Sequence, residues 1–322
     1  MNQRRNRSHP KLLELTEEVQ LNYKKLVQPL FVVQGLTEKQ AVPGLGGVFR
    51  ETPDSLVRQV AQDKERGVSK FILFGVPSEK RDEKFDFDFT ATQIHHLKKE
   101  FGADIWLAVD VCLCSYTSHG HCGVLNNERS HVDNHASVSE LTRAALAYAQ
   151  HGADCVAPSD MMDGRIASIR AALDQDALDQ KTIMSYSAKF NSRFYGPFRV
   201  AADSAPKEGI STLRDRSSYQ ILPSRYSDAL ASSLRDAAEG ADILMVKPAM
   251  PYLDVLYRLS QEIPTKPWAV YEVSGEYAAV ELLGEKGLID PRLGHLEAWT
   301  GMFRAGAQMV LSYGARHAKG WI

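Results

Sequence analysis

The sequence of 322 residues has little excess charge, few cysteines and no long apolar run. Its 38 basic and 40 acidic side chains give a formal net charge of −2, which argues against binding by bulk charge, so we expect no nucleic-acid partner. No apolar run approaches the ~18 residues that a membrane span needs, and none follows the arginine-rich start, so we expect no membrane segment and no secretory signal. Four cysteines in such a chain predict a reducing, cytoplasmic setting, with thiols kept for a metal or for catalysis rather than for disulfides.

A dinucleotide-binding fingerprint is also missing, because no G-x-G-x-x-G follows an early strand. The chain instead alternates apolar, β-rich runs with amphipathic helical stretches. The predicted strands occupy residues 26–33, 68–75, 104–113, 153–159, 182–188, 241–246, 268–274 and 308–313. The predicted helices, which lie between most of these strands, occupy residues 53–66, 137–150, 164–173, 226–239, 251–262 and 292–305. Glycine, which readily closes a helix in a left-handed conformation, stands just before five strands, at Gly67, Gly102, Gly152, Gly240 and Gly306.

Eight strands alternating with helices predict an α/β fold of the (β/α)8 TIM-barrel type more than an open doubly wound sheet. We expect residues 26–322 to form one TIM-barrel catalytic domain. It would be preceded by an extended, polar N-terminal arm at residues 1–25, weakly helical from 12 to 23. Two segments are too long for ordinary connections. Residues 77–89 are a charged excursion, and residues 189–225 are expected to form a lid.

The apolar run 241–246 ends abruptly in Lys247, and Pro248 and Pro251 follow. Such a run is typical of a strand buried on both faces, and the prolines force the chain to turn after it. A lysine at the edge of an apolar core has a lowered pKa, because its ammonium form is poorly solvated, and its amine can attack carbonyl groups. The alternative is a structural lysine whose stem covers the barrel rim while its charge reaches water.

Reactive side chains stand at the ends of several predicted strands, where TIM barrels carry their chemistry. These residues are Asp110, Cys112, Cys114, Ser159, Asp160, Lys189, Lys247, Ser274 and Tyr313. Their gathering predicts an enzyme. Lys189 and Lys247 end adjacent strands, and each cation disfavours the other, so one should be neutral near pH 7, as Schiff-base chemistry requires. Two unrelated rim lysines are the alternative.

Cys112, Cys114 and Cys122 form a C-x-C-x7-C pattern in a turn that also holds His119 and His121. Three thiolates without a fourth nearby suit a Zn²⁺ ion that keeps one position open, which is the catalytic arrangement. A disulfide between Cys112 and Cys114 would be strained, and either histidine could also ligate. Reduced thiols without a metal are the alternative. Cys155 lies inside a predicted strand and is expected to belong to the core.

The predicted lid combines aromatic rings with arginines. The rings are Phe190, Phe194, Tyr195 and Phe198, and the arginines are Arg193, Arg199, Arg214 and Arg216. This composition suits a lid that excludes water and binds a carboxylate through paired guanidinium hydrogen bonds, with the remaining arginines on the surface.

Five stretches together resemble zinc-dependent porphobilinogen synthases, also called 5-aminolaevulinate dehydratases. They are DVCLCSYTSHGHCG at 110–123, PSDMMDGR at 158–165, MSYSAKF at 184–190, MVKP at 245–248 and VSGEY at 273–277. The similarity extends from residue 26 to residue 313. It implies a barrel lyase that condenses two 5-aminolaevulinate molecules asymmetrically into porphobilinogen through lysine Schiff bases, with loss of two waters, in tetrapyrrole and haem biosynthesis.

The resemblance also implies roles for individual residues. Lys247 would form a Schiff base with the first substrate and Lys189 with the second. Ser274 and Tyr313 would hold the first carboxylate, and Arg199, Arg216 and Gln220 the second. Cys112, Cys114 and Cys122 would bind one catalytic Zn²⁺ per subunit, and Asp110, Ser159, Asp160 and Tyr195 would lie near the reacting centre. The family assembles as homo-octamers through an N-terminal arm, a part that residues 1–25 could play.

The chain departs from the family at two metal sites. Ser232 stands where members with an allosteric Mg²⁺ carry a glutamate, and Arg235 lies one turn on, so the resemblance does not extend to that Mg²⁺ site. His121 is present, but Ser218 replaces a cysteine that helps some members bind a second zinc. Two rival functions remain open. A single-lysine aldolase-type barrel leaves Lys189 and the cysteines unexplained, and a zinc or redox sensor without turnover leaves both lysines unexplained.

Overall fold

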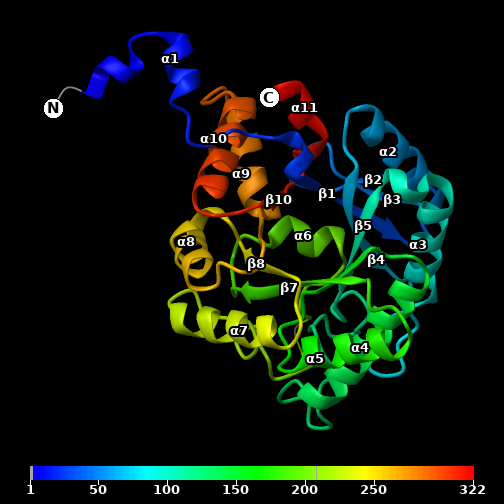
Figure 1. Ribbon diagram of the computed structural model, residues 1–322. Helices are drawn as coiled ribbons and strands as arrows, with labels where there is room; N and C mark the ends of the chain where they lie inside the picture. Colours follow the sequence, from blue (N-terminus) through cyan, green and yellow to red (C-terminus); the bar gives the residue numbers. More distant parts are fainter. Residues whose placement is uncertain (1–2, 208) are drawn as a thin grey trace.

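The structure is a computed structural model that describes residues 3–207 and 209–322, and its centre is a closed parallel barrel (Figure 1). The barrel strands, in order around the sheet, are β1 (Leu26–Val33), β4 (Lys70–Val76), β5 (Trp106–Val111), β6 (Cys155–Pro158), β7 (Thr182–Lys189), β8 (Ile243–Lys247), β9 (Trp268–Tyr271) and β10 (Met309–Leu311). Leu26 pairs with Val310 and Val27 with Leu311, so the last strand closes on the first. The predicted TIM barrel is confirmed.

Helices surround the strands (Figure 1). They are α2 (Pro53–Glu65), α3 (Asp88–Phe101), α4 (Asn134–Gln150), α5 (Arg165–Gln175), α7 (Tyr226–Ala238), α8 (Leu253–Glu262), α9 (Ser274–Glu285), α10 (Pro291–Arg304) and, at the carboxyl end, α11 (Ala318–Trp321). Sequence reasoning missed α3 and α9. In α3 the buried apolar residues are only Ala91, Ile94 and Leu97. Only two residues separate the start of helix α9 at Ser274 from the end of strand β9 at Tyr271, so no long polar segment marked the boundary.

The strands are buried on both faces, which explains their continuous apolar runs. Val27 and Phe31 of β1 belong to the cluster inside the barrel, whereas Leu26, Leu30 and Val32 of the same strand pack outward with the helices. Cys155 lies in the inner cluster, so its predicted place in the core is confirmed. The five glycines before the strands all have positive φ, between 52° and 111°, as the predicted helix ends require.

Several elements that do not belong to the strand–helix alternation of the barrel lie before and after its first strand. A short hairpin of β2 (Gln40–Ala41) and β3 (Phe49–Glu51) follows β1, and β3 pairs with β1 in parallel. Before β1 lie η1 (Gln3–Arg7), α1 (Pro10–Leu15) and η2 (Tyr23–Lys25), none of which has a buried residue. Figure 1 shows α1 projecting from the barrel. Within the described ranges, every helix is too short or too polar to cross a membrane.

After Lys189 ends β7, the described residues of the long segment 189–225 hold one short helix, α6 (Gly196–Ala201), and are otherwise irregular. Phe198 of α6 packs on Phe31 and Phe74, whose ring centroids lie 5.6 and 5.1 Å away, so this helix lies over the interior of the barrel. The segment therefore has the position that we expect of a lid.

Candidate active site

Lys189 and Lys247 are the last residues of the neighbouring strands β7 and β8, and they stand directly opposite each other in the register. A register shift between Ser185 and Ala188 produces this pairing, because β7 has one residue more than β8 over that stretch. Such bulges re-aim side chains near functional sites. Both lysines are about 95% buried, with 5% and 4% of their surface exposed.

Aromatic rings enclose the amine of Lys247. Its Nζ lies 4.1 Å from the ring centroid of Tyr271, and the ring centroids of Tyr186, Phe198 and Tyr195 lie 5.0, 5.0 and 5.5 Å away. Within residues 3–207 and 209–322 no carboxylate forms an ion pair with it. Burial, together with the positive charge of Lys189, lowers the pKa of Lys247 to about 7. The expected neutral lysine is therefore Lys247.

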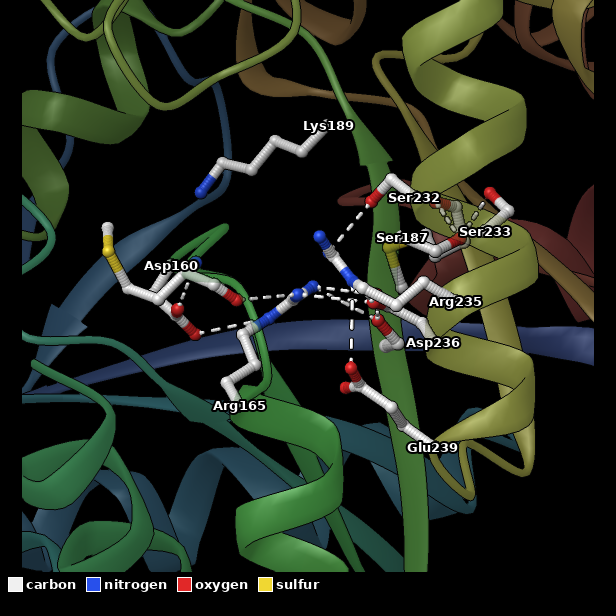
Figure 2. Close-up of polar contacts among 12 residues, drawn as sticks. Asp160, Arg165, Ser187, Lys189, Ser232, Ser233, Arg235, Asp236 and Glu239 are labelled. Atoms are coloured by element: carbon white, nitrogen blue, oxygen red, sulfur yellow. Dashed lines mark hydrogen bonds and ion pairs between the residues drawn. The ribbon is translucent and has the colours of Figure 1, made fainter. Parts of the chain in front are cut away.

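Lys189 has more polar surroundings. Its Nζ donates a hydrogen bond of 2.5 Å to the main-chain oxygen of Ser159, in the segment after β6. Figure 2 shows Lys189 extending from its strand toward the segment that carries Asp160. The two amines thus differ in what they face. Lys247 lies among rings, and Lys189 is anchored to the main chain.

Asp160 is linked to a buried charge network that the sequence did not predict (Figure 2). The guanidinium of Arg165 is fully buried between Asp160, at 3.5 Å, and Asp236 of α7, at 3.0 Å. Ser185 of β7 also donates a 2.6 Å hydrogen bond to Asp236. This network joins the segment after β6, strand β7 and helix α7. Arg165 is the last residue of the motif PSDMMDGR at 158–165, but the sequence does not indicate which acidic residues form ion pairs with it.

The outer end of the network lies on α7. Arg235 forms ion pairs with Asp163, Asp236 and Glu239 and hydrogen-bonds Ser232 at 3.3 Å. Ser232 is therefore next to a guanidinium group at the position where the resemblance placed a departure from the family (Figure 2).

Asp110 is the second-last residue of β5. Its buried carboxylate oxygen Oδ1 has no hydrogen-bond partner among the described residues. Burial and the nearby thiol of Cys114 raise the pKa of Asp110 to about 7, and Lys189, the hydroxyl of Ser159 and Lys247 oppose the rise. The strand ends at Val111, two residues earlier than predicted, so the cysteines lie in the loop that follows it.

The three cysteines of that loop meet. The Sγ atoms of Cys112, Cys114 and Cys122 all lie within 4.8 Å of one another, and all three thiols are free and buried. Cys112 and Cys114 are 3.4 Å apart between sulfurs, which is no disulfide. Neither His119 nor His121 belongs to this cluster within the described residues, and His121 instead contacts the hydroxyl of Tyr219 at 3.1 Å. Three buried soft donors without a carboxylate suit a thiophilic ion such as Zn²⁺ with an open position.

Three side chains of the lid segment that the resemblance assigned to a carboxylate, and also Ser204, have buried polar atoms without a hydrogen-bond partner among the described residues. In the three assigned side chains these atoms are Nε of Arg199, Nε of Arg216, and Oε1 and Nε2 of Gln220. Burial and the positive charge of Arg216 lower the pKa of Arg199, so the two guanidinium groups are close enough to repel each other. Arg216 also donates to the main-chain oxygens of Gly120 and Ser204, but buried guanidinium donors are normally all paired, so the free Nε atoms mark a place for an anion.

The other predicted residues lie at the same mouth of the barrel. Ser274 begins α9, and its Oγ accepts a hydrogen bond of 3.0 Å from the backbone of Phe198. The hydroxyl of Tyr313, after β10, accepts one of 3.3 Å from Tyr271. The hydroxyl of Tyr195 donates to the main-chain oxygens of Phe190 and Lys247, at 2.9 and 3.3 Å, and its ring centroid lies 5.5 Å from Nζ of Lys247. Its contacts are those of a residue that positions the strand end.

Known proteins are similar to this chain over nearly its whole length. The family model for delta-aminolevulinic acid dehydratase matches residues 1–321. Delta-aminolevulinic acid dehydratases of Bacillus subtilis and Mycobacterium tuberculosis are similar to this chain at 38% and 42% identity. They cover 99% of it in both cases, with 97% and 96% of their own lengths. The enzyme of that name from Macaca fascicularis is 40% identical over 95% of this chain and 93% of its own length.

Solved structures agree as well. The delta-aminolevulinic acid dehydratase (porphobilinogen synthase) of Toxoplasma gondii, determined with the reaction product porphobilinogen, superposes with a TM-score of 0.94 at 36% identity. The match covers 100% of this chain and 91% of that one. The dihydropteroate synthase of Stenotrophomonas maltophilia is similar at a TM-score of 0.52 and 9% identity, over 94% of this chain and 92% of that one. This second likeness shows a shared barrel fold alone.

Proposed function

The chain belongs to the delta-aminolevulinic acid dehydratase family of lyases, and on this premise we propose that it is a porphobilinogen synthase. The proposed reaction condenses two molecules of 5-aminolaevulinate into porphobilinogen with loss of two waters, as a step of tetrapyrrole and haem biosynthesis. The observation that carries the proposal is the pair of buried lysines, opposite each other in register, at the ends of β7 and β8.

The first covalent step falls to Lys247. Its pKa of about 7 leaves roughly half of the amine unprotonated at neutral pH. The neutral amine adds to the ketone carbon of the first substrate, and a water carrying the ketone oxygen leaves as the imine forms. A protonated imine is a better electrophile than a ketone and makes the neighbouring C–H more acidic, which prepares carbon–carbon bond formation. We propose that Lys189 forms the corresponding imine with the second substrate.

An asymmetric product needs two different pockets for two identical substrates. We propose that Ser274 and Tyr313 bind the carboxylate of the first substrate. Arg199, Arg216 and Gln220 would bind that of the second, and their buried atoms without partners support this assignment. Two guanidinium groups in a dry site bind a carboxylate strongly. Closure of the segment 189–225 over both would exclude water from the imines.

The three thiols would hold the metal, which we propose to be one Zn²⁺ per subunit, and we propose no Mg²⁺ beside Ser232. When bound, Zn²⁺ supplies a Lewis acid that keeps the second substrate's amine unprotonated or activates a water. Asp110 and Ser159 would handle protons, because the free carboxylate oxygen of Asp110 and the Ser159 segment lie beside the lysines. Asp160 would supply a negative charge facing Lys189. We assign the proton transfers to Asp110 and Ser159 together.

We further propose that the protein is cytoplasmic and assembles as a homo-octamer through residues 1–25. Leu13 and Leu15 of α1 support this, because they are 44% and 82% exposed and have no core of their own to join. A second copy would bury them.

The decisive experiment supplies 5-aminolaevulinate and measures the pyrrole product by its colour with an aldehyde reagent, with and without a chelator. Borohydride trapping followed by mass spectrometry then locates the imine. We expect colour that the chelator abolishes, and substrate attached to Lys247. An imine without pyrrole would favour an aldolase-type reaction, and absence of both would favour a metal or redox sensor.

A further inference from the structure

Glu276, in the first turn of α9, is a carboxylate that none of the roles above uses. Its side chain is 1% exposed, and it accepts three hydrogen bonds from main-chain N–H groups. Val273, which precedes α9, donates at 2.7 Å, and Ala249 and Met250, in the loop after β8, donate at 3.3 and 2.5 Å. One carboxylate thus joins two loops at the mouth of the barrel.

Each of these loops follows a strand of the active site. Ala249 and Met250 lie two and three residues after Lys247, and Val273 directly precedes Ser274. Burial raises the pKa of Glu276 to about 8, against the lowering effect of these N–H donors, so the anchor rests on geometry: one oxygen accepts from Met250, and the other accepts from Val273 and Ala249. The distance between the chain after Lys247 and the start of α9 is therefore set by Glu276.

The same end of α9 also receives the lid. The N–H of Gly275 donates to the main-chain oxygen of Phe194 at 2.8 Å, and Ser274 accepts from Phe198. A Cβ atom added to Gly275 would lie 2.7 Å from the oxygen of Phe194, so this contact admits no larger residue. Phe198 in turn places its ring 5.0 Å from Nζ of Lys247. The apolar wall around the amine is thus held through α9.

We propose that Glu276 is a positioning residue for imine formation at Lys247. It fixes the loop that follows the lysine against the helix end that carries Ser274 and holds the lid. The inference rests on the proposed Schiff-base chemistry, and it adds a residue that contacts neither amine. Shifts of about 1 Å in such arrangements lower rates on the order of 10²-fold.

The test is Glu276→Gln, which keeps the shape of the side chain but replaces one acceptor oxygen with an N–H₂ group that faces main-chain N–H donors. The full-length holoenzyme is mixed with 5-aminolaevulinate, and the rate of borohydride-trapped imine at Lys247 is measured by mass spectrometry. We expect a loss of roughly 10- to 100-fold in that rate, with a larger change in kcat than in KM. The matched control is Glu281→Gln, on the same helix, whose carboxylate contacts His295 instead; it should trap imine at the wild-type rate.

Wild-type trapping by Glu276→Gln would overturn the inference while leaving the proposed function intact. Absence of an imine in the wild-type protein would overturn the proposed function, and this inference with it. Should Glu276→Gln fail to fold, Glu276→Asp keeps the carboxyl group but shortens the reach by one methylene, and the same loss is expected. Failure of both variants to fold, with Glu281→Gln intact, would assign Glu276 to stability alone and overturn the positioning role.

Discussion

Lys247 and Arg165 are both buried cations of this barrel, and their surroundings are opposite. Lys247 lies among four aromatic rings, close to a second lysine, without an ion pair to a carboxylate among the described residues. Arg165, which is fully buried, lies between the carboxylates of Asp160 and Asp236. A buried positive charge is expensive unless it is paired. The barrel pairs the guanidinium, and it leaves the amine unpaired so that the amine can lose its proton.

The difference separates a structural charge from a reactive one. Arginine cannot deprotonate in a protein, so its burial must be compensated by acids, and here those acids connect strand β7 and helix α7. Lysine can become neutral, and the absence of a compensating acid is what makes its amine a nucleophile. The same reasoning separates Lys247 from Lys189, which is held by a main-chain oxygen beside Asp160.

Replacement of Lys247, the buried cation without an ion-pair partner, should have the largest effect on activity. Lys247→Ala removes the only group that can form the first imine, so we expect activity to fall by more than roughly 10³-fold. Pyrrole formation measures this. The isosteric Lys247→Met should be at least as resistant to denaturant as the wild-type protein, because no charge is left buried without a partner. Retained activity in either variant would contradict the role of Lys247.

Replacement of Arg165 tests the structural side. Arg165→Met leaves Asp160 without its cation and Asp236 with only Arg235, and we expect a loss of about 3–5 kcal/mol in the free energy of unfolding. The control is Arg235→Met, whose partly exposed side chain should cost about 1 kcal/mol or less. Urea unfolding of the three proteins measures both values. Equal stability of Arg165→Met and the wild-type protein would show that the network is dispensable.

The sequence predicted the position of Lys247 far better than it predicted the ion pairs of Arg165. Strand β1 has both of its predicted ends, and the lysines were located because a buried run ends in each of them. Local patterns of this kind are visible along the chain. The bond between Arg165 and Asp236 joins residues 71 positions apart, and the carboxylate of Glu276 reaches back 27 residues to Ala249. Contacts between residues so far apart leave no periodic pattern in the sequence.

Small backbone irregularities were equally invisible. The extra residue in β7 decides that Lys189 stands opposite Lys247, yet the run MSYSAKF reads as an ordinary strand. The strand before the cysteines was predicted to end at residue 113 and ends at Val111, because Cys112 and Leu113 are apolar enough to extend the run. The hydrogen bonds from the hydroxyl of Tyr195 to the main-chain oxygens of Phe190 and Lys247 were not visible in the sequence either.

Disruption of the three-thiol cluster should show whether the bound metal contributes to imine formation at Lys247. Cys122→Ala removes one of three donors, so we expect metal content and pyrrole formation to fall together by tenfold or more, an order-of-magnitude value for a lost ligand. The imine at Lys247 should still be trapped, because burial and the positive charge of Lys189, not the metal, lower the pKa of that amine. Metal analysis and trapping on one preparation check both. Full activity without metal would contradict the assignment of the thiols.

The pH dependence of imine formation gives the smallest effect and the finest test of why Lys247 differs from Arg165. Raising the pH removes the proton from Lys247, so the trapping rate should rise through a pKa of about 7 and then level off. Below that pKa, the rate should fall about tenfold per pH unit. Lys189→Met removes the neighbouring positive charge, one of the two main causes of the lowered pKa, and should move the rise to higher pH. Asp110 and the thiols of Cys112 and Cys114 oppose the lowering, so their replacement should move it the other way. A rise that stays in place in Lys189→Met would leave burial as the sole cause, and a rate independent of pH from 6 to 9 would remove the neutral amine from the explanation.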